Sequence, residues 1–481
     1  MELPDTTTPA PDTLVTTPVS AATVSAATAA ASPAPWSPAT RFGFRIAFLY
    51  FFCFIFLFGN GTLFGVFPVV GGWIQSKLNW PFNHLSEFTG QHLFHLTGIA
   101  AHWHPSESGD TMMNWIQNGL FLTFALAGGI VWTFIALLRN NPRTEYRTLD
   151  SWLRFLLRLT CAMFMAGYGL AKVFPLQMPP PSIAVLNEPV GNLSPMTLLW
   201  NLIGLSPVYE IICGSAELLG GMLLLYRRTA LAGALFSAFV MANVVFYNFC
   251  YDVPVKIFAV NLLLGCIFLA LPDALSLWRF FWSHKPAAPT ATWVPPAPRR
   301  AGRIAILVTE IVFAVAFLVV RPIFMTMGWH HLQAALRTPS PLVGAWHLDA
   351  THPASGAFID PEGRPVTDLY VAPSSRAYTR STDGELWLSS VNLDSKKHTV
   401  RISCYFIGPP TNYTWQLSDP DHLILTSVPP DPPKPDPQHK HESPAAQFSP
   451  AVLTLTRIPT PAHYPLLERG FHFVNEWRYE R

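Results

Sequence analysis

The amino-acid sequence predicts a membrane all-α helical bundle of about seven transmembrane helices, followed by an all-β domain. Half of the 481 residues are hydrophobic and 12% are charged, whereas soluble globular proteins carry about 25% charged residues. Seven stretches are apolar and long enough to cross a bilayer, which takes about 20 residues. From residue 344 the pattern changes to short alternating runs that are typical of strands. The lipid bilayer is therefore the first partner that the chain predicts.

Charge and cysteine content exclude other classes of protein. The net charge of +2 is too small to suggest a nucleic-acid partner. Five of the six cysteines fall in or beside apolar segments. No disulfide framework and no cysteine metal site can be read from their spacing.

The chain divides into six predicted regions. Residues 1–40 are rich in Thr, Ala, Pro and Ser and contain no Lys or Arg, which favours a disordered cytoplasmic tail. Two transmembrane helices and a His-rich outer loop occupy 41–138, and a four-helix core occupies 150–275. A Pro-rich cytoplasmic linker, 283–300, precedes the seventh helix at 304–322, and a β domain fills 344–481. The predicted spans are 44–67, 115–138, 153–174, 207–226, 230–249, 255–272 and 304–322.

Basic residues between the spans indicate the orientation of the bundle. The loops after the second, fourth and sixth spans carry nearly all of the loop Lys and Arg. By the positive-inside rule these loops are cytoplasmic, so the N-terminus is cytoplasmic and the β domain is periplasmic or extracellular. We expect a multi-pass protein of a bacterial inner membrane.

Short alternating runs predict the β domain. They begin at Ala345, Glu385, Thr399, Thr414, His422 and Val452, and turn residues separate them. This pattern is typical of a meander that forms a small antiparallel barrel or sandwich. A Pro- and His-rich insert at 429–444 reads as a loop within it. The fold alone decides no function.

Five ionisable residues in the predicted core are candidates for a functional site. Charges within membrane segments are costly and are functional candidates by default. The orientation places four of them at the outer end of the bundle, and Glu217, seven residues after Glu210 on the same helix face, lies deeper. Three acids against two bases would leave one carboxyl suited to carrying protons. The candidate polar cluster is Lys172, Glu210, Glu217, Asp252 and Lys256.

Simpler roles remain open for most of this cluster. Asp252, two residues before Pro254, can cap the helix that follows. Lys172 and Lys256 can extend to the membrane interface, and Glu210 can be solvated there. Glu217 is the residue hardest to explain without function or structural pairing.

Histidines in the first outer loop invite a metal hypothesis. His92 and His95 would share a face if the loop is helical. No cysteine or tight carboxylate set accompanies them, and histidines mixed with Trp and Phe are also typical of an interfacial helix. We therefore predict no metal site and keep these two histidines as weak candidates.

Several motifs in the core resemble one known family. They are Gly167-Tyr-Gly-Leu-Ala-Lys172, Glu217-Leu-Leu-Gly-Gly-Met, Arg227 with Arg228, Tyr251-Asp-Val-Pro-Val-Lys256 and Leu271-Pro-Asp273. Together they resemble the four-helix core of the DoxX family of bacterial membrane proteins. The likeness extends to Ser108-Gly-Asp-Thr111 and, more weakly, to the stretch from Arg469 to Glu476, as in a longer branch with extra helices and a C-terminal domain.

The resemblance implies a function class without a reaction. The family is named for a subunit of a thiosulfate:quinone oxidoreductase, so one hypothesis is a component of a quinone-linked membrane redox system, with quinone as its cofactor. No catalytic residue can be carried over from the family. The alternative is a non-enzymatic membrane scaffold or small-solute carrier whose outer β domain binds a membrane or extracytoplasmic protein partner. The appended domain and the absence of any nucleotide or haem motif motivate it.

Overall fold

The computed structural model describes thirteen stretches of the chain. They are residues 35–58, 63–66, 68–103, 108–139, 143–286, 293–349, 358–360, 363–374, 376–394, 397–404, 411–429, 451–461 and 463–468. Most of the predicted tail 1–40 and of the insert 429–444 lies outside these residues, as does the stretch 469–476.

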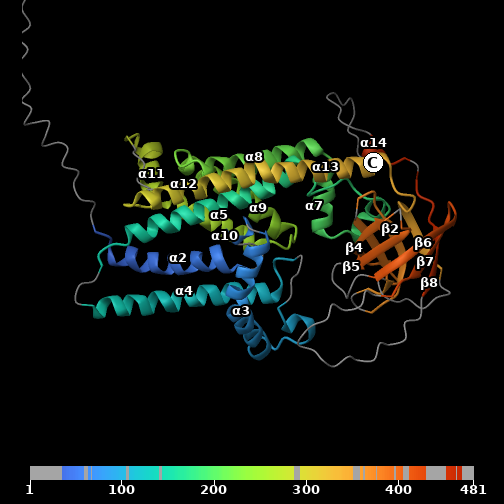
Figure 1. The fold of residues 1–481 in the computed structure, drawn as a ribbon, viewed down its shortest axis with the longest axis horizontal. Helices are drawn as coiled ribbons and strands as arrows, with labels where there is room; N and C mark the ends of the chain where they lie inside the picture. The colour runs from blue at the N-terminus through green and yellow to red at the C-terminus, as the bar shows by residue number, and fades with distance from the viewer. Residues whose placement is uncertain are drawn as a thin grey trace, which may run out of the picture.

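Seven helices in the described residues are long and apolar enough to span a membrane, which agrees with the predicted number. The protein is therefore a multi-pass membrane protein. The helices run roughly parallel along the bundle, and the β domain lies at one end of it (Figure 1). The helical elements are α2 (Pro38–Leu57), α3 (Pro68–His92), α4 (Met112–Leu138), α5 (Arg147–Val173), α6 (Ile183–Leu186), α7 (Pro195–Gly204), α8 (Pro207–Leu225), α9 (Ala230–Cys250), α10 (Lys256–Ala270), α11 (Ala274–Ser283), α12 (Arg300–Val315), α13 (Arg321–Arg337) and α14 (Pro465–Glu468).

Helix α5 lies at the centre of the bundle. Its membrane-length window is 78% buried, against 11% to 56% for the other six. It packs most closely on α8, where glycines let the two backbones approach. A methyl group added at Gly169 would stand 2.5 Å from the backbone nitrogen of Leu218, and one at Gly214 would stand 2.6 Å from the carbonyl oxygen of Gly169. The α5–α8 contact therefore has no room for a side chain at either position.

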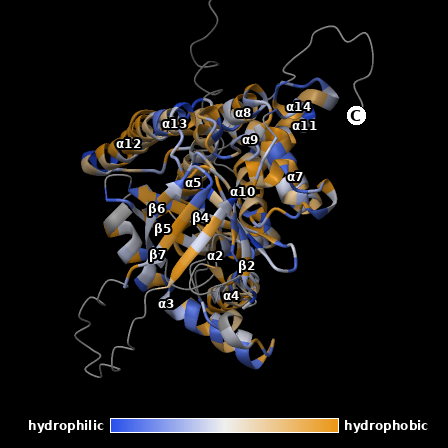
Figure 2. Ribbon diagram, turned by 90° about the vertical axis from the view of Figure 1, so that its right-hand side faces the viewer, coloured by the Kyte–Doolittle hydropathy of each residue, from blue (hydrophilic) through white to orange (hydrophobic). Residues whose placement is uncertain are grey.

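Three helices depart from the predicted boundaries. Helix α2 ends at Leu57, ten residues before the predicted end of the first span, because Gly59, Asn60 and Gly61 follow and are poor helix formers. The predicted outer loop is largely the helix α3, which projects from the bundle in both views (Figures 1 and 2). The helix of the seventh span extends beyond residue 322, since α12 and α13 form one continuous helix from Arg300 to Arg337.

The last membrane helix is continuous because a π-helical segment accommodates its proline. Residues Ala316–Val320 adopt π geometry immediately before Arg321 and Pro322. A proline removes one backbone N–H and crowds the carbonyl four residues earlier, and a π-helical turn relieves such a defect without breaking the helix. Helix α13 can therefore carry the chain on to the β domain.

The β domain is a closed eight-stranded antiparallel barrel in which each strand pairs with the next and β8 pairs with β1. This supports the barrel alternative, and the structure adds β2 and β3 to the six predicted runs. Seventeen buried residues, among them Trp346, Phe358 and Tyr413, form its core cluster. The strands are β1 (Gly344–Leu348), β2 (Val366–Val371), β3 (Arg376–Ser381), β4 (Leu386–Asp394), β5 (Thr399–Cys404), β6 (Thr411–Asp419), β7 (His422–Ser427) and β8 (Val452–Arg457).

The segment between α5 and α8 docks the barrel on the bundle. Ala184 of α6 is fully buried against Ala345 and Tyr370 of the barrel. Glu188, whose side chain is 2% exposed, accepts a hydrogen bond of 2.6 Å from Arg380 of β3. Such a shielded pair resists breaking, because losing one partner would leave the other charge buried and unpaired.

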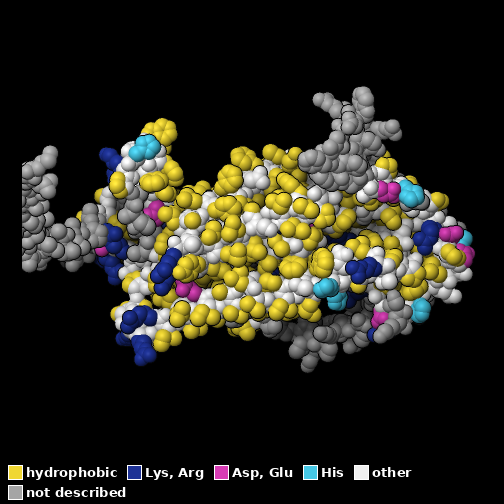
Figure 3. Space-filling view, turned by 90° about the horizontal axis from the view of Figure 1, so that it is seen from above, with side chains coloured by type: hydrophobic (Ala, Val, Ile, Leu, Met, Phe, Trp, Pro, Cys, Tyr) yellow, Lys and Arg dark blue, Asp and Glu magenta, His cyan; other side chains and the backbone are white. Residues whose placement is uncertain are grey.

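Surface colouring shows an apolar middle and charged ends. Hydrophobic side chains cover the middle of the bundle, and Lys and Arg gather at the end away from the barrel (Figure 3). Lipid contact explains the large number of exposed apolar side chains, such as Phe239 at 77% and Leu137 at 75%.

Two glycines two residues apart on α5 give a direct test of the α5–α8 contact. Gly169→Ala places its methyl group against the α8 backbone and should destabilise the bundle by about 1–3 kcal/mol. Gly167→Ala, where nothing lies within 4 Å of the added methyl group, should be neutral or slightly stabilising. SDS-induced unfolding of both variants measures the difference, and equal stabilities would show that the contact tolerates a side chain.

Candidate functional site

The deepest residue of the predicted cluster is paired. Lys172, at the end of α5, donates to both carboxylate oxygens of Glu217 on α8, at 2.9 and 2.8 Å. The two side chains are 5% and 6% exposed. Because Gly214 lies one turn before Glu217 against the Lys172 Cβ atom, the close approach of α5 and α8 brings the two charges together. The sequence predicted both residues, and the structure joins them.

Further polar side chains surround this pair. The Lys172 Nζ atom lies 5.8 Å from the centre of the Tyr168 ring, within range of a cation–π attraction. Tyr247 and Cys213 lie within electrostatic range of Glu217. The pair is thus the centre of a polar region shared by α5, α8 and α9.

Glu210 lies in the same region and is fully buried, not solvated at the surface as one interpretation of the sequence had it. Its Oε1 atom accepts a hydrogen bond of 3.0 Å from the backbone N–H of Met178. Its Oε2 atom has no hydrogen-bond partner among the described residues. Both Lys172 and Arg376 of the barrel lie within electrostatic range of this carboxyl group.

Asp252 and Lys256 form a second group, and the predicted helix cap was wrong. Asp252 is 82% exposed and pairs with Lys256 at 2.7 Å. The residue that caps α10 is Asp110, whose carboxylate accepts from the backbone N–H groups of Lys256 at 2.6 Å and Ile257 at 3.0 Å. Asp252 lies three residues before Val255, the N-cap residue of α10, and its carboxylate accepts from the Lys256 side chain instead. Within the described part of the chain, no hydrogen bond or ion pair joins this group to Lys172, Glu210 or Glu217.

The two candidate histidines have local roles. His92 ends α3, where its ring stacks on Phe88 at 4.2 Å and its Nδ1 atom lies 2.9 Å from the Phe88 carbonyl oxygen. His95 follows the helix in a left-handed conformation. Among the described residues, no group of three or more His, Cys, Asp or Glu side chains is arranged to hold a metal ion.

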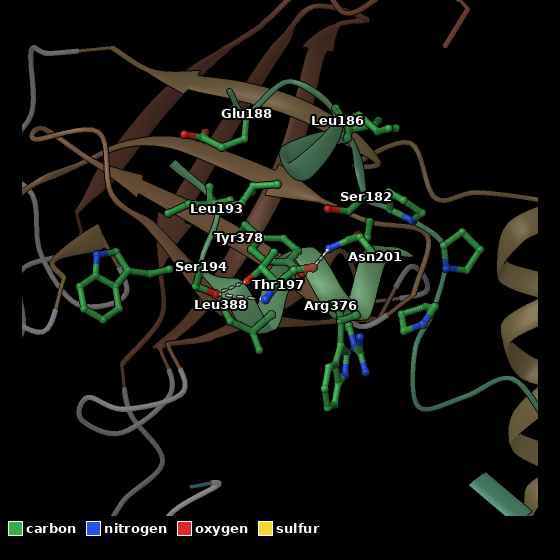
Figure 4. Close-up of a pocket in the computed structure, with 18 of the residues that line it drawn as sticks. Ser182, Leu186, Glu188, Leu193, Ser194, Thr197, Asn201, Arg376, Tyr378 and Leu388 are labelled. Atoms are coloured by element: carbon green, nitrogen blue, oxygen red, sulfur yellow. Dashed lines mark hydrogen bonds between the residues drawn. The ribbon is translucent and has the colours of Figure 1, made fainter. Parts of the chain in front are cut away.

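A large cavity lies where the barrel meets the bundle. Its volume is about 1110 Å³, slightly above the range of about 300–1,000 Å³ that is typical of ligand pockets. Ser182, Ser194, Thr197 and Asn201 come from the segment between α5 and α8, and the outer face of β3 and β4 lies opposite (Figure 4). The labelled barrel side chains are Arg376, Tyr378 and Leu388.

Strand alternation explains which barrel residues face this cavity. In β3, Ala377, Thr379 and Ser381 point into the barrel and are buried. Arg376 and Tyr378 alternate with them and therefore stand on the outer face. We call this space, lined by the α5–α8 segment, α13 and the outer face of β3 and β4, the junction cavity.

An ion-pair network closes one side of the junction cavity. Arg380 donates to Glu188, donates to the Tyr370 hydroxyl at 3.2 Å and lies 3.5 Å from Asp368. Burial raises the pKa of Tyr370, so its hydroxyl stays protonated at neutral pH. Asp368 also lies 2.7 Å from His347. These contacts fix the barrel face against the bundle and so define the cavity wall.

The junction cavity was not predicted. No motif marks it, because its walls come from segments far apart in the chain, such as those of Ser182 and Arg376. One signal was present in the sequence. Residues 179–201 combine five prolines with Trp200, Leu193, Ser194 and Asn201, a mixture of apolar and hydrogen-bonding residues that a loop exposed only to water does not need.

The fold and the cavity define a multi-pass membrane protein with an appended barrel and a potential binding site between its two parts. No family model matches the chain, and no solved structure matches it. It is 34% identical over 133 residues to the uncharacterized protein YwoB of Bacillus subtilis (strain 168), a match that covers 26% of this chain and 79% of that relative. The chain belongs to the same family as that protein.

The buried Lys172–Glu217 pair predicts a large stability effect when one charge is removed. Lys172→Met leaves the Glu217 carboxylate unpaired and should cost about 3–5 kcal/mol. The double variant Lys172→Met with Glu217→Met removes both charges and should recover most of this loss. SDS-induced unfolding measures both proteins. A double variant as unstable as the single one would show that packing, not charge, sets the cost.

The bonds at the start of α10 predict that Asp110 stabilises the protein more than Asp252 does. Asp110→Ala removes the side chain that accepts two backbone N–H bonds and should destabilise the protein by about 1–2 kcal/mol. Asp252→Ala removes an exposed pairing and should change stability by less than about 1 kcal/mol. The same unfolding assay compares them, and an equal or reversed order would show that the two Asp110 bonds do not stabilise the start of α10.

Proposed function

We propose that the chain is a non-enzymatic membrane module that binds a small partner molecule in the junction cavity. In this proposal it is a DoxX-like protein of a bacterial inner membrane, with its barrel on the outer side. The gathering of Lys and Arg at the end of the bundle away from the barrel supports that orientation. A protein partner of the barrel remains a prediction from the sequence.

The junction cavity is the observation that carries this proposal. It is lined by both parts of the molecule, it is about 1110 Å³ in volume, and it offers hydroxyl, amide and guanidinium groups beside apolar side chains. Ligand sites are typically of this kind, mostly apolar with a few polar groups, and often lie between domains. Four of the charged residues that the sequence favoured are in contrast paired with one another, Lys172 with Glu217 and Asp252 with Lys256, and Glu210 bonds the backbone N–H of Met178.

A quinone-linked redox component is the second candidate. It is favoured by the unpartnered, fully buried Oε2 atom of Glu210 beside the Lys172–Glu217 pair. A buried acid with a free oxygen could hydrogen-bond a quinone headgroup or exchange protons with it. Tyr168 and Cys213 would then border the headgroup.

One experiment separates the two candidates. The protein is purified in nanodiscs, and its retained small molecules are identified by mass spectrometry. The junction proposal expects a retained molecule that Leu388→Trp displaces, because the larger side chain narrows the cavity. The double variant Lys172→Met with Glu217→Met should keep this molecule. The redox candidate expects a retained quinone that Leu388→Trp keeps and that the double variant Lys172→Met with Glu217→Met loses. If neither variant changes what is retained, the junction proposal fails.

A further inference from the structure

We propose that the ligand of the junction cavity is an anionic lipid-like molecule, with a carboxylate or phosphate headgroup at Arg376 and one long apolar chain along the β3–β4 hairpin. This inference rests on the proposed function and adds the chemical class of the ligand. It depends on the charge of the cavity wall, on its length and on its contact with the lipid-facing helices.

Arg376 lines the cavity, and most of its N–H donors are available to bind an anion. Its Nη2 atom donates one long bond of 3.5 Å to the carbonyl oxygen of Gln177, while a guanidinium has five N–H donors. Among the described residues it forms no salt bridge. The acids that line the cavity are neutralised elsewhere, because Glu188 pairs with Arg380, and Asp383 and Glu385 pair with Arg364. The nearby Glu210, within electrostatic range of Arg376, is bonded to the backbone of Met178 and does not line the cavity.

The cavity is long in one direction. Its barrel wall extends from Arg376 to the turn at Asp383–Glu385. The register pairs Arg376 with Ser390 and Arg380 with Leu386, so this wall follows about five residues of strand, or roughly 16 Å. Tyr378, Leu388 and Leu386 lie along it. A polar solute would fill only a small part of this length, whereas a headgroup with a hydrocarbon chain matches it.

The apolar side of the cavity continues onto exposed apolar surface of α7 and α13. Leu336 of α13 lines the cavity and is 43% exposed. On α7, Trp200 lines the cavity while Leu202, two residues on, is 64% exposed. Helix α13 is the continuation of a membrane-length helix. An amphiphile can therefore pass from the bilayer into the cavity along apolar side chains. Its charged headgroup would leave the headgroup region of the bilayer and bind Arg376.

Binding of a fluorescent long-chain fatty acid to the full-length protein in detergent tests this inference. We expect saturable binding that unlabelled oleate and the single-chain lipid lysophosphatidylglycerol displace and that inorganic phosphate does not. Arg376→Gln should weaken the affinity about tenfold or more, since it removes the charged donor. Arg401→Gln is the matched control, because Arg401 is an exposed barrel arginine that lines a different, smaller cavity of about 640 Å³.

The alternative outcomes have separate meanings. Displacement by inorganic phosphate alone would indicate a simple anion site and overturn the lipid-like ligand. An effect of Arg401→Gln without one of Arg376→Gln would place the probe in the smaller cavity and would also overturn it. If the fatty acid does not bind while Leu388→Trp still displaces a retained molecule, only this inference fails. If no molecule is retained either, the proposed function fails with it. Gel filtration and SDS-induced unfolding confirm that each variant is folded, and Leu388→Trp gives a second test should Arg376→Gln misfold.

Discussion

The burial of three cations on α5 is the constraint on which the rest of the bundle depends. Arg154 donates to the carbonyl oxygens of Phe268 and Leu269 at the end of α10. Arg158, fully buried, donates to those of Leu224 and Leu225 at the end of α8. It also bonds the carboxylate of Glu310 on α12. With Lys172 on Glu217, each cation therefore ties α5 to another helix.

These contacts are favourable because of where the charges lie. The last carbonyls of a helix have no intrahelical partner and carry a partial negative charge. A guanidinium placed there satisfies several acceptors at once. In a membrane, where water cannot replace a lost bond, the cost of leaving such groups unpaired is several kcal/mol each. These bonds offset the free energy of burying charged side chains in a membrane helix, so α5 can carry them. The same bonds fix the positions of the neighbouring helices along α5.

Local patterns and membrane depth predicted much of the molecule. The seven spans follow from apolar length. The order of the helices placed Lys172 at the outer end of the bundle and Glu217 deeper, whereas the structure joins the two side chains. The cap of α10 could not be found in this way, because Asp110 is 146 residues from Lys256. The sequence pattern favoured Asp252 as the cap because it lies just before the helix. The two strands that were missed, β2 and β3, lack a clear apolar alternation. In β3, for example, Arg and Tyr on the outer face alternate with small residues that point into the barrel.

The junction cavity could not be predicted for a further reason, which also bears on its function. It exists only while the barrel is docked, and docking rests on the Glu188–Arg380 pair and the small patch around Ala184. A ligand that binds in the docked state and not in the undocked state stabilises docking by the free energy of its own binding. By the same linkage, any partner that holds the barrel in place raises the affinity for the ligand by an equal factor. Docking of the barrel and binding in the cavity are thus thermodynamically coupled. In the proposed module, a bound lipid-like molecule would change the position of the barrel without a chemical reaction.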